Sequence, residues 1–109
     1  MTQPHPTTVS THVLDAALGR PAAGLDLILV LPDDSGRTAT TDADGRVRFE
    51  GEVLPGPHIL TFATGPWFAE QDRETFFPEV SVGFTVTEGE HHHVALLLSP
   101  FSYTTYRGS

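Results

Sequence analysis

Apolar residues in this chain occur only in short runs, which are separated by clusters of glycine, proline, aspartate and serine. The longest unbroken apolar runs, 27–31 and 94–98, contain five residues each. A membrane-spanning helix needs about 20 such residues, so these runs are too short to cross a bilayer. Runs of this length between turn-forming residues are typical of β-strands. The pattern therefore predicts a protein built almost entirely from strands, with no membrane partner.

About eight segments fit this strand pattern. Between two of them, the Asp-Gly pair of Asp42-Ala43-Asp44-Gly45 is a strong hairpin signal. One segment, 66–72, favours a short helix, because Pro66 suits a first helical turn and good helix formers follow it. Strands of this number and length favour an all-β, antiparallel sandwich of two sheets. The predicted strands are 7–14, 25–31, 37–41, 46–50, 58–64, 80–87, 92–98 and 103–107.

The composition allows one small domain and excludes several kinds of partner. A length of 109 residues, 39% of them hydrophobic, supplies one core, which we expect at 7–109 after a flexible N-terminus at 1–6. The net charge of −8 and the scattered basic residues argue against nucleic acid and anionic membrane surfaces. The N-terminus lacks the charged and apolar regions of a secretory signal. We therefore expect a soluble, cytoplasmic protein.

Any chemistry has to come from histidine, carboxylate, hydroxyl or arginine side chains, because the chain contains no cysteine. The sequence has no Gly-x-Ser-x-Gly elbow, no glycine-rich phosphate loop and no His-Glu-x-x-His helix. Lipase-like, nucleotide-binding and zinc-protease chemistry are therefore not expected. We expect the protein to use no cofactor.

Histidines are the main candidates for a functional site. The side chains of a strand alternate between its two faces, so His91 and His93 are expected on one face and His92 on the other. A pair on one face could bind metal or move protons, and it could equally be exposed after an acidic turn. Two ligands are too few for a zinc site, so we expect no metal. The six histidines are at positions 5, 12, 58, 91, 92 and 93.

Other residues carry groups that could act on a ligand. His12 lies in the first predicted strand, and Ser10 is expected on the same face of that strand. His12 is either an acid–base group or an ordinary sheet residue. Arg46 follows the predicted hairpin turn, where its guanidinium could hold a planar anionic or imide-like ligand or could remain solvated. The chain ends in Tyr106-Arg107-Gly108-Ser109, which is either a functional segment or an ordinary edge strand.

Four blocks of sequence, taken in order, resemble the transthyretin-related family and its enzymatic branch, which acts in urate degradation. They are 10–15, 42–46, 77–80 and 93–109. The last block ends in Tyr106-Arg107-Gly108-Ser109, which resembles the hydrolases and which the hormone carrier of the family lacks. The resemblance covers nearly the whole chain. It implies a sandwich of about eight strands with one short helix, assembled as a homotetramer that is a dimer of dimers.

The resemblance also implies an activity. This is the hydrolysis of 5-hydroxyisourate to 2-oxo-4-hydroxy-4-carboxy-5-ureidoimidazoline, by attack of water on the C6 carbonyl. One imidazole of His12 and His93 is then expected to act as general base, with Ser10 supporting His12. Arg46 is expected to stabilise the developing oxyanion. The residues that match the family site are His12, Arg46, His93 and Ser109 as catalytic groups, and Tyr106, Arg107 and Gly108 as substrate-binding groups.

Two other functions fit the same fold. A carrier of a small aromatic ligand needs an apolar channel, so the two histidines and Arg46 count against it. A structural or adhesion sandwich would use His12 and His93 as ordinary strand residues. Ligand binding without turnover would identify the carrier, and a monomeric mass would favour the structural domain.

Overall fold

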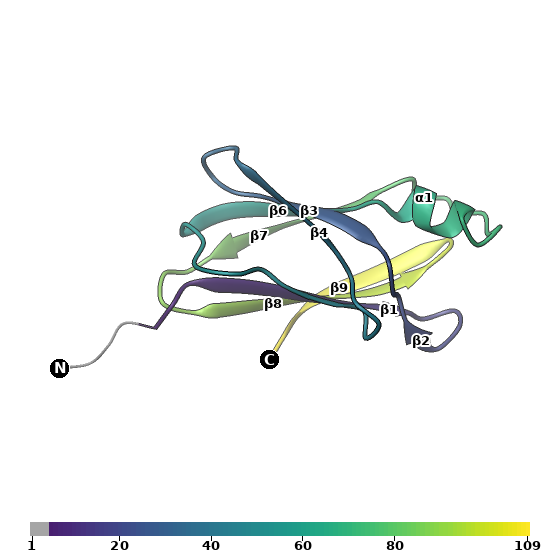
Figure 1. Ribbon diagram of the computed structural model, residues 1–109, viewed down its shortest axis with the longest axis horizontal. Helices are drawn as coiled ribbons and strands as arrows, with labels where there is room; N and C mark the ends of the chain where they lie inside the picture. The colour runs from purple at the N-terminus through teal and green to yellow at the C-terminus, as the bar shows by residue number, and fades with distance from the viewer. Residues whose placement is uncertain (1–4) are drawn as a thin grey trace.

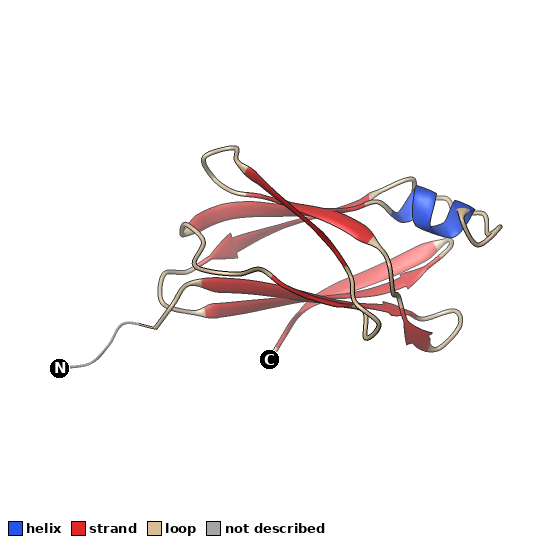
Figure 2. Cartoon of the chain, in the orientation of Figure 1, coloured by secondary structure: helices blue, strands red, loops and turns tan. Residues whose placement is uncertain are grey.

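The computed structural model describes residues 5–109 as two β-sheets packed face to face, with a short helix at one end (Figures 1 and 2). The first sheet contains β1 (Thr8–Asp15), β2 (Arg20–Pro21), β5 (Arg46–Arg48), β8 (His91–Ser99) and β9 (Ser102–Gly108). The second sheet contains β3 (Asp26–Val30), β4 (Gly36–Thr40), β6 (Gly56–Phe62) and β7 (Val80–Val86). The helix α1 (Thr64–Ala69) connects β6 to β7. The predicted all-β sandwich with one short helix is confirmed.

The strand order is β2-β1-β8-β9 in the first sheet, where β5 also pairs with β1, and β4-β3-β6-β7 in the second. All pairs are antiparallel except β1 with β8, which is parallel. For this one pair the antiparallel expectation is wrong. The two strands are separated by almost the whole chain, so no short turn constrains their relative direction.

The prediction of a hairpin around Asp42 to Gly45 is correct for the turn but wrong for the pairing of the two flanking strands. The turn itself forms, since the N–H of Gly45 donates to the carbonyl oxygen of Asp42 at 2.9 Å and Gly45 has a positive φ of 74°. However, β4 on one side of the turn belongs to the second sheet, and β5 on the other side pairs with β1. A Cβ atom at residue 45 would overlap with the carbonyl oxygen of Val13, so glycine lets this turn pack against β1.

Two other boundaries differ from the sequence prediction. The two-residue strand β2 lies where only a turn was expected, and it pairs with the last two residues of β1. The helix begins at Thr64 and ends at Ala69, whereas 66–72 was predicted. Of the flexible N-terminus expected at 1–6, residues 1–4 lie outside the described residues. Within residues 5–109, no helix has the length and hydrophobicity that a bilayer-spanning segment requires.

The core lies between the two sheets and is formed by the inward side chains of alternating strand positions. Val9, Leu29, Leu60, Phe62 and Leu96 are completely buried in it. Burial of a large aliphatic or aromatic side chain stabilises the fold by about 1.5–3 kcal/mol. Because this face of the first sheet is used for the core, the opposite face of β1, β8 and β9 is left for polar side chains.

A partly buried ion pair attaches the segment after α1 to the first sheet. The guanidinium of Arg73 donates to Asp15 at 2.7 Å and lies over the ring of Phe68, 4.8 Å from its centroid. Burial opposes ionisation of Asp15, but hydrogen bonds from Arg73 and from the N–H of Leu18 hold the pKa of this carboxyl below 3.8. The carboxylate is 1% exposed, so it depends on these partners.

We expect Arg73→Met to lower the free energy of unfolding by about 2 kcal/mol at pH 7, because Asp15 would lose its cation. A lowered carboxyl pKa stabilises the fold above the unfolded pKa and ceases to do so as pH falls through the folded value. The difference between wild type and variant should therefore shrink below pH 3.8. Urea unfolding at several pH values measures this. Arg20→Met, at an exposed residue of β2, is the control, and equal stability of wild type and Arg73→Met would contradict the prediction.

Candidate functional site

The outer face of the first sheet, opposite the core, collects most of the predicted site residues. Residues opposite each other on paired strands point to the same face. Ser10 pairs with Arg48 of β5 and with His93 of β8, and His93 pairs with Gly108 of β9. Four strands thus contribute one residue each to the same row. The neighbouring row of the same face contains Arg46, His12, Ala95 and Tyr106.

The imidazole rings of His12 and His93 lie beside each other on this face. Their centroids are 6.4 Å apart and their planes are tilted by 41°. His12 donates from Nε2 to the carbonyl oxygen of Asp44 at 2.9 Å, so Nδ1 of neutral His12 keeps its lone pair. Nδ1 of His93 lies 2.7 Å from Oγ of Ser10, which leaves Nε2 of His93 to face a ligand. The structure therefore brings together the two histidines that the sequence singled out.

A cavity of about 500 Å³ opens beside His93. Arg46 is exposed at its rim, and within residues 5–109 its guanidinium forms no ion pair. This guanidinium can therefore bind an oxygen-rich or anionic ligand. Polar groups dominate the wall, in contrast to the apolar lining of most small-molecule carriers. Residues lining the cavity include Ser10, Arg46, Arg48, His91, His93 and Ser109.

The surroundings of His93 favour its neutral form. Partial burial, followed by the neighbouring His12, Arg46 and His91, lowers the pKa of His93 below its usual value of 6.5. Each of these neighbours is a cation when protonated, so a second positive charge on His93 would be repelled. At pH 7 the imidazole is therefore uncharged and can accept a proton from a water molecule.

Gly108 lies against the imidazole ring of His93. A Cβ atom at residue 108 would overlap with Cδ2 of His93. Only glycine lets the C-terminal strand come this close to the ring while His93 remains hydrogen-bonded to Ser10. The structure thus gives Gly108, singled out in the terminal motif, a packing contact in the site.

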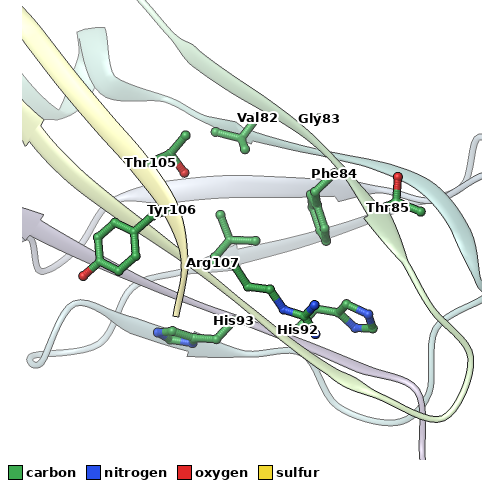
Figure 3. Close-up of a pocket in the computed structure, with 10 residues that line it drawn as sticks. Val82, Gly83, Phe84, Thr85, His92, His93, Thr105, Tyr106 and Arg107 are labelled. Atoms are coloured by element: carbon green, nitrogen blue, oxygen red, sulfur yellow. The ribbon is translucent and has the colours of Figure 1, made fainter. Parts of the chain in front are cut away.

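The terminal motif is divided between the two faces of β9 (Figure 3). Tyr106 points to the same side as His93, whereas Arg107 points to the other side and extends toward His92. Arg107 donates to a carboxylate oxygen of Glu90 at 3.2 Å and to the carbonyl oxygen of His91 at 3.3 Å. Its side chain lines a smaller cavity of about 220 Å³ between β7, β8 and β9. In this chain Arg107 is therefore separated from His12 and Arg46 by the sheet.

The sequence analysis expected Ser10 to support His12, but Ser10 contacts two other histidines instead. Its Oγ lies between Nε2 of His91, at 2.8 Å, and Nδ1 of His93, at 2.7 Å. On the far side of His91, Nδ1 lies 2.6 Å from Oγ1 of Thr8. Alternation predicted that His91 and His93 share a face, which is confirmed. Sequence reasoning missed the connection through Ser10, because it depends on the parallel register of β1 and β8.

His92 has a structural role on the opposite face. It is 3% exposed, donates from Nδ1 to the carbonyl oxygen of Thr8 at 3.1 Å, and accepts from the N–H of Thr87 at 2.9 Å. Both ring nitrogens are thus used to join β8 to its neighbours. Among the described residues, no group of three or more histidine or carboxylate side chains is arranged to hold a metal ion.

Comparisons with known proteins agree on one family. The HIUase/transthyretin family model matches residues 9–108. The chain is 41% identical over 109 residues to a 5-hydroxyisourate hydrolase of Salmonella dublin, covering 93% of this chain and 80% of that protein. The structure of Klebsiella pneumoniae 5-hydroxyisourate hydrolase has a TM-score of 0.86 at 37% identity, covering 94% of this chain and all of that one. Sea bream transthyretin in complex with thyroxine has a TM-score of 0.78 at 31% identity, covering 92% and 93%.

Proposed function

The chain belongs to the HIUase/transthyretin family, and on this premise we propose that it is an enzyme of urate degradation that hydrolyses 5-hydroxyisourate. The product would be 2-oxo-4-hydroxy-4-carboxy-5-ureidoimidazoline. One observation carries the proposal beyond family membership. His12 and His93 lie side by side, with Arg46 beside a polar cavity on the same face. A proton acceptor next to a cation is an arrangement that promotes amide hydrolysis by water, because the base activates the water and the cation stabilises the oxyanion.

In the proposed mechanism a water molecule attacks the C6 carbonyl and the N1–C6 bond breaks. His93 is the general base, because its lowered pKa keeps the imidazole neutral at neutral pH. With its hydrogen on Nδ1, donated to Oγ of Ser10, Nε2 is the nitrogen that accepts the proton. It takes a proton from the attacking water and returns it to N1 as that nitrogen leaves. His12 has a lone pair on Nδ1 when neutral, so it accepts a hydrogen bond from the same water and orients it. No covalent intermediate with the protein is needed.

Arg46 stabilises the negative charge that develops on the carbonyl oxygen in the transition state. Its guanidinium has several donors in a plane, which suits the flat carbonyl-rich ring of 5-hydroxyisourate. Ser109 lines the same cavity, where its hydroxyl oxygen can accept hydrogen bonds from N–H groups of the substrate and orient it. Tyr106 lies on the site face of β9, opposite Ala95 of β8, where its ring closes the edge of the site.

A carrier with the same fold is the main alternative, since the family also contains transthyretin in complex with thyroxine. The polar cavity beside His93 favours the enzyme. The test follows the ultraviolet absorbance of 5-hydroxyisourate freshly made from urate by urate oxidase. Hydrolase activity accelerates its decay, whereas decay at the spontaneous rate, together with saturable binding of the compound, would establish a carrier.

We also propose that the protein is a homotetramer, arranged as a dimer of dimers. The strands β7 and β9 are the last strands of the two sheets, so each has a backbone edge that no described strand covers. Uncovered edges pair readily with a second copy of the same chain. We expect light scattering to give about 47 kDa, which is four times the chain mass of 11.8 kDa. A mass of 11.8 kDa at micromolar concentration would contradict this assembly.

A further inference from the structure

The carboxylate of Asp42 holds the backbone of the turn that this residue begins. Its Oδ1 atom accepts hydrogen bonds from the N–H groups of Asp44 and Arg46, each at 2.9 Å. The N–H group between these two, that of Gly45, donates to the main-chain carbonyl oxygen of Asp42 at 2.9 Å. Aspartate suits such a turn because its short side chain reaches N–H groups a few residues further along the chain. Asp42 therefore accepts from three successive N–H groups of the turn.

Two peptide groups of this turn connect Asp42 to β1. The N–H of the peptide group 44–45 donates to Asp42, and its carbonyl oxygen accepts from Nε2 of His12 at 2.9 Å. The N–H of the next peptide group, 45–46, donates to the Asp42 carboxylate, and its carbonyl oxygen accepts from the N–H of Val13 at 2.8 Å. The N–H and C=O of a trans peptide group point in opposite directions, so each group has Asp42 on one side and β1 on the other. The orientation of both peptide groups is thereby fixed.

The orientation of the turn decides the state of two groups in the proposed mechanism. A carbonyl oxygen can only accept, so that of Asp44 keeps the hydrogen of neutral His12 on Nε2 and leaves the lone pair on Nδ1. The bond from the N–H of Arg46 to Asp42, together with the pairing of Arg46 with His12, fixes the point from which the guanidinium extends. Asp42 also lines the same cavity as Arg46 and His93. One carboxylate thus supports both the histidine that orients water and the arginine that stabilises the oxyanion.

We propose that Asp42 is a positioning residue for hydrolysis, which acts through His12 and Arg46 and does not touch the substrate. Its Oδ1 atom holds the turn in the orientation in which Nδ1 of His12 can accept a hydrogen bond from the attacking water. The proposal rests on the proposed hydrolase function. The reaction needs Asp42 as an acceptor for two N–H groups, and does not need its negative charge. Asp42 is exposed, so loss of its side chain should affect the rate more than folding.

Three substitutions of Asp42 separate the acceptor from the charge. Asp42→Ala removes the acceptor and should lower kcat for 5-hydroxyisourate about 10- to 100-fold with little change in KM, because both supported groups act in the transition state. Asp42→Asn keeps an acceptor oxygen at the same place, so its kcat should stay within about threefold of wild type. Asp42→Ser has a shorter side chain that forms the same kind of turn more weakly, so its rate should lie between those of Asp42→Asn and Asp42→Ala.

Asp33 provides a matched control in the second sheet. Its Oδ1 atom accepts from the N–H and from Oγ of Ser35, at 3.0 and 2.6 Å, in the turn between β3 and β4. Asp33→Ala therefore removes the same kind of contact from a turn of the other sheet, and kcat should not change. An equal loss of rate in Asp33→Ala and Asp42→Ala would assign the effect to general loosening of the fold and would overturn the proposal.

The rates of the Asp42 variants can contradict the proposal in two further ways. Wild-type kcat in Asp42→Ala would show that the reaction does not depend on the carboxylate. An Asp42→Asn protein as slow as Asp42→Ala would show that the reaction needs the negative charge. If Asp42→Ala does not fold, Asp42→Ser takes its place in both comparisons, and its rate must fall below that of Asp42→Asn.

Nitrogen-15 NMR tests the connection to His12 without turnover. Above neutral pH, wild-type His12 should show one tautomer, with its hydrogen on Nε2. In Asp42→Ala it should show the averaged signals of two tautomers, as expected for the exposed His5, whereas His93, held by Ser10, should keep its own tautomer. An unchanged His12 in this variant would overturn the proposal. Absence of hydrolysis by the wild-type protein would instead refute the proposed function, and the NMR spectra would still decide whether Asp42 controls His12.

Discussion

His93→Gln is expected to lower kcat/KM for 5-hydroxyisourate by about 10² to 10⁴-fold, because it removes the proposed general base. Glutamine has a similar size and can still hydrogen-bond to Ser10, so the sheet around the site should remain intact. Initial rates of the absorbance decay measure the effect, and thermal unfolding checks the fold. His5→Gln is the control for loss of a histidine, since His5 is exposed and lies outside the strands.

The pH dependence provides a second check on His93. A base works in its neutral form, so wild-type kcat/KM should be constant near neutral pH and should fall as pH decreases through the lowered pKa of His93. The residual rate of His93→Gln should lack this fall. Near-wild-type rates in the variant would contradict the assignment. A large loss in His12→Gln together with a small loss in His93→Gln would assign the base to His12.

Arg46→Ala is expected to lower kcat by about 10² to 10³-fold, because the oxyanion would lose its charged donor in the transition state. Arg46→Lys keeps the positive charge but not the planar pair of donors, so its rate should lie between those of alanine and wild type. The side chain of Arg46 is exposed and within residues 5–109 has no ion-pair partner, so folding should be unaffected by either change. Arg20→Ala, at an exposed arginine of β2, is the control.

Arg46 should also affect the base that it faces. Its positive charge contributes to lowering the pKa of His93, so its removal should raise that pKa. The acid limb of the pH–rate profile should therefore move to higher pH in Arg46→Ala and stay nearly unchanged in Arg46→Lys. If Arg46→Ala retains full activity, oxyanion stabilisation by this residue is ruled out. If Arg46→Ala has low activity but an unchanged pH–rate profile, Arg46 acts on the substrate and its charge does not lower the pKa of His93.

Local sequence patterns predicted most of the fold because strand formation here depends on neighbouring residues. Each of the eight predicted segments overlaps an observed strand, since short apolar runs between turn formers have few other ways to bury their side chains. The Asp42 to Gly45 turn also formed as its Asp-Gly pair indicated. The turn sequence does not predict that β4 and β5 belong to different sheets. Strand partners are determined by the packing of the whole sandwich.

Candidate site residues could be found from the sequence because their types and their alternation are local properties. The spacing of His91 and His93 predicted a common face, and the same rule separates Tyr106 from Arg107 on β9. Only the tertiary structure decided which strands meet. The parallel register of β1 and β8 places Ser10 beside His93 and brings His12 next to it, and the close approach of β9 places Gly108 against the ring. Side-chain alternation depends on two successive residues, whereas register between distant strands is set by burial of the entire core.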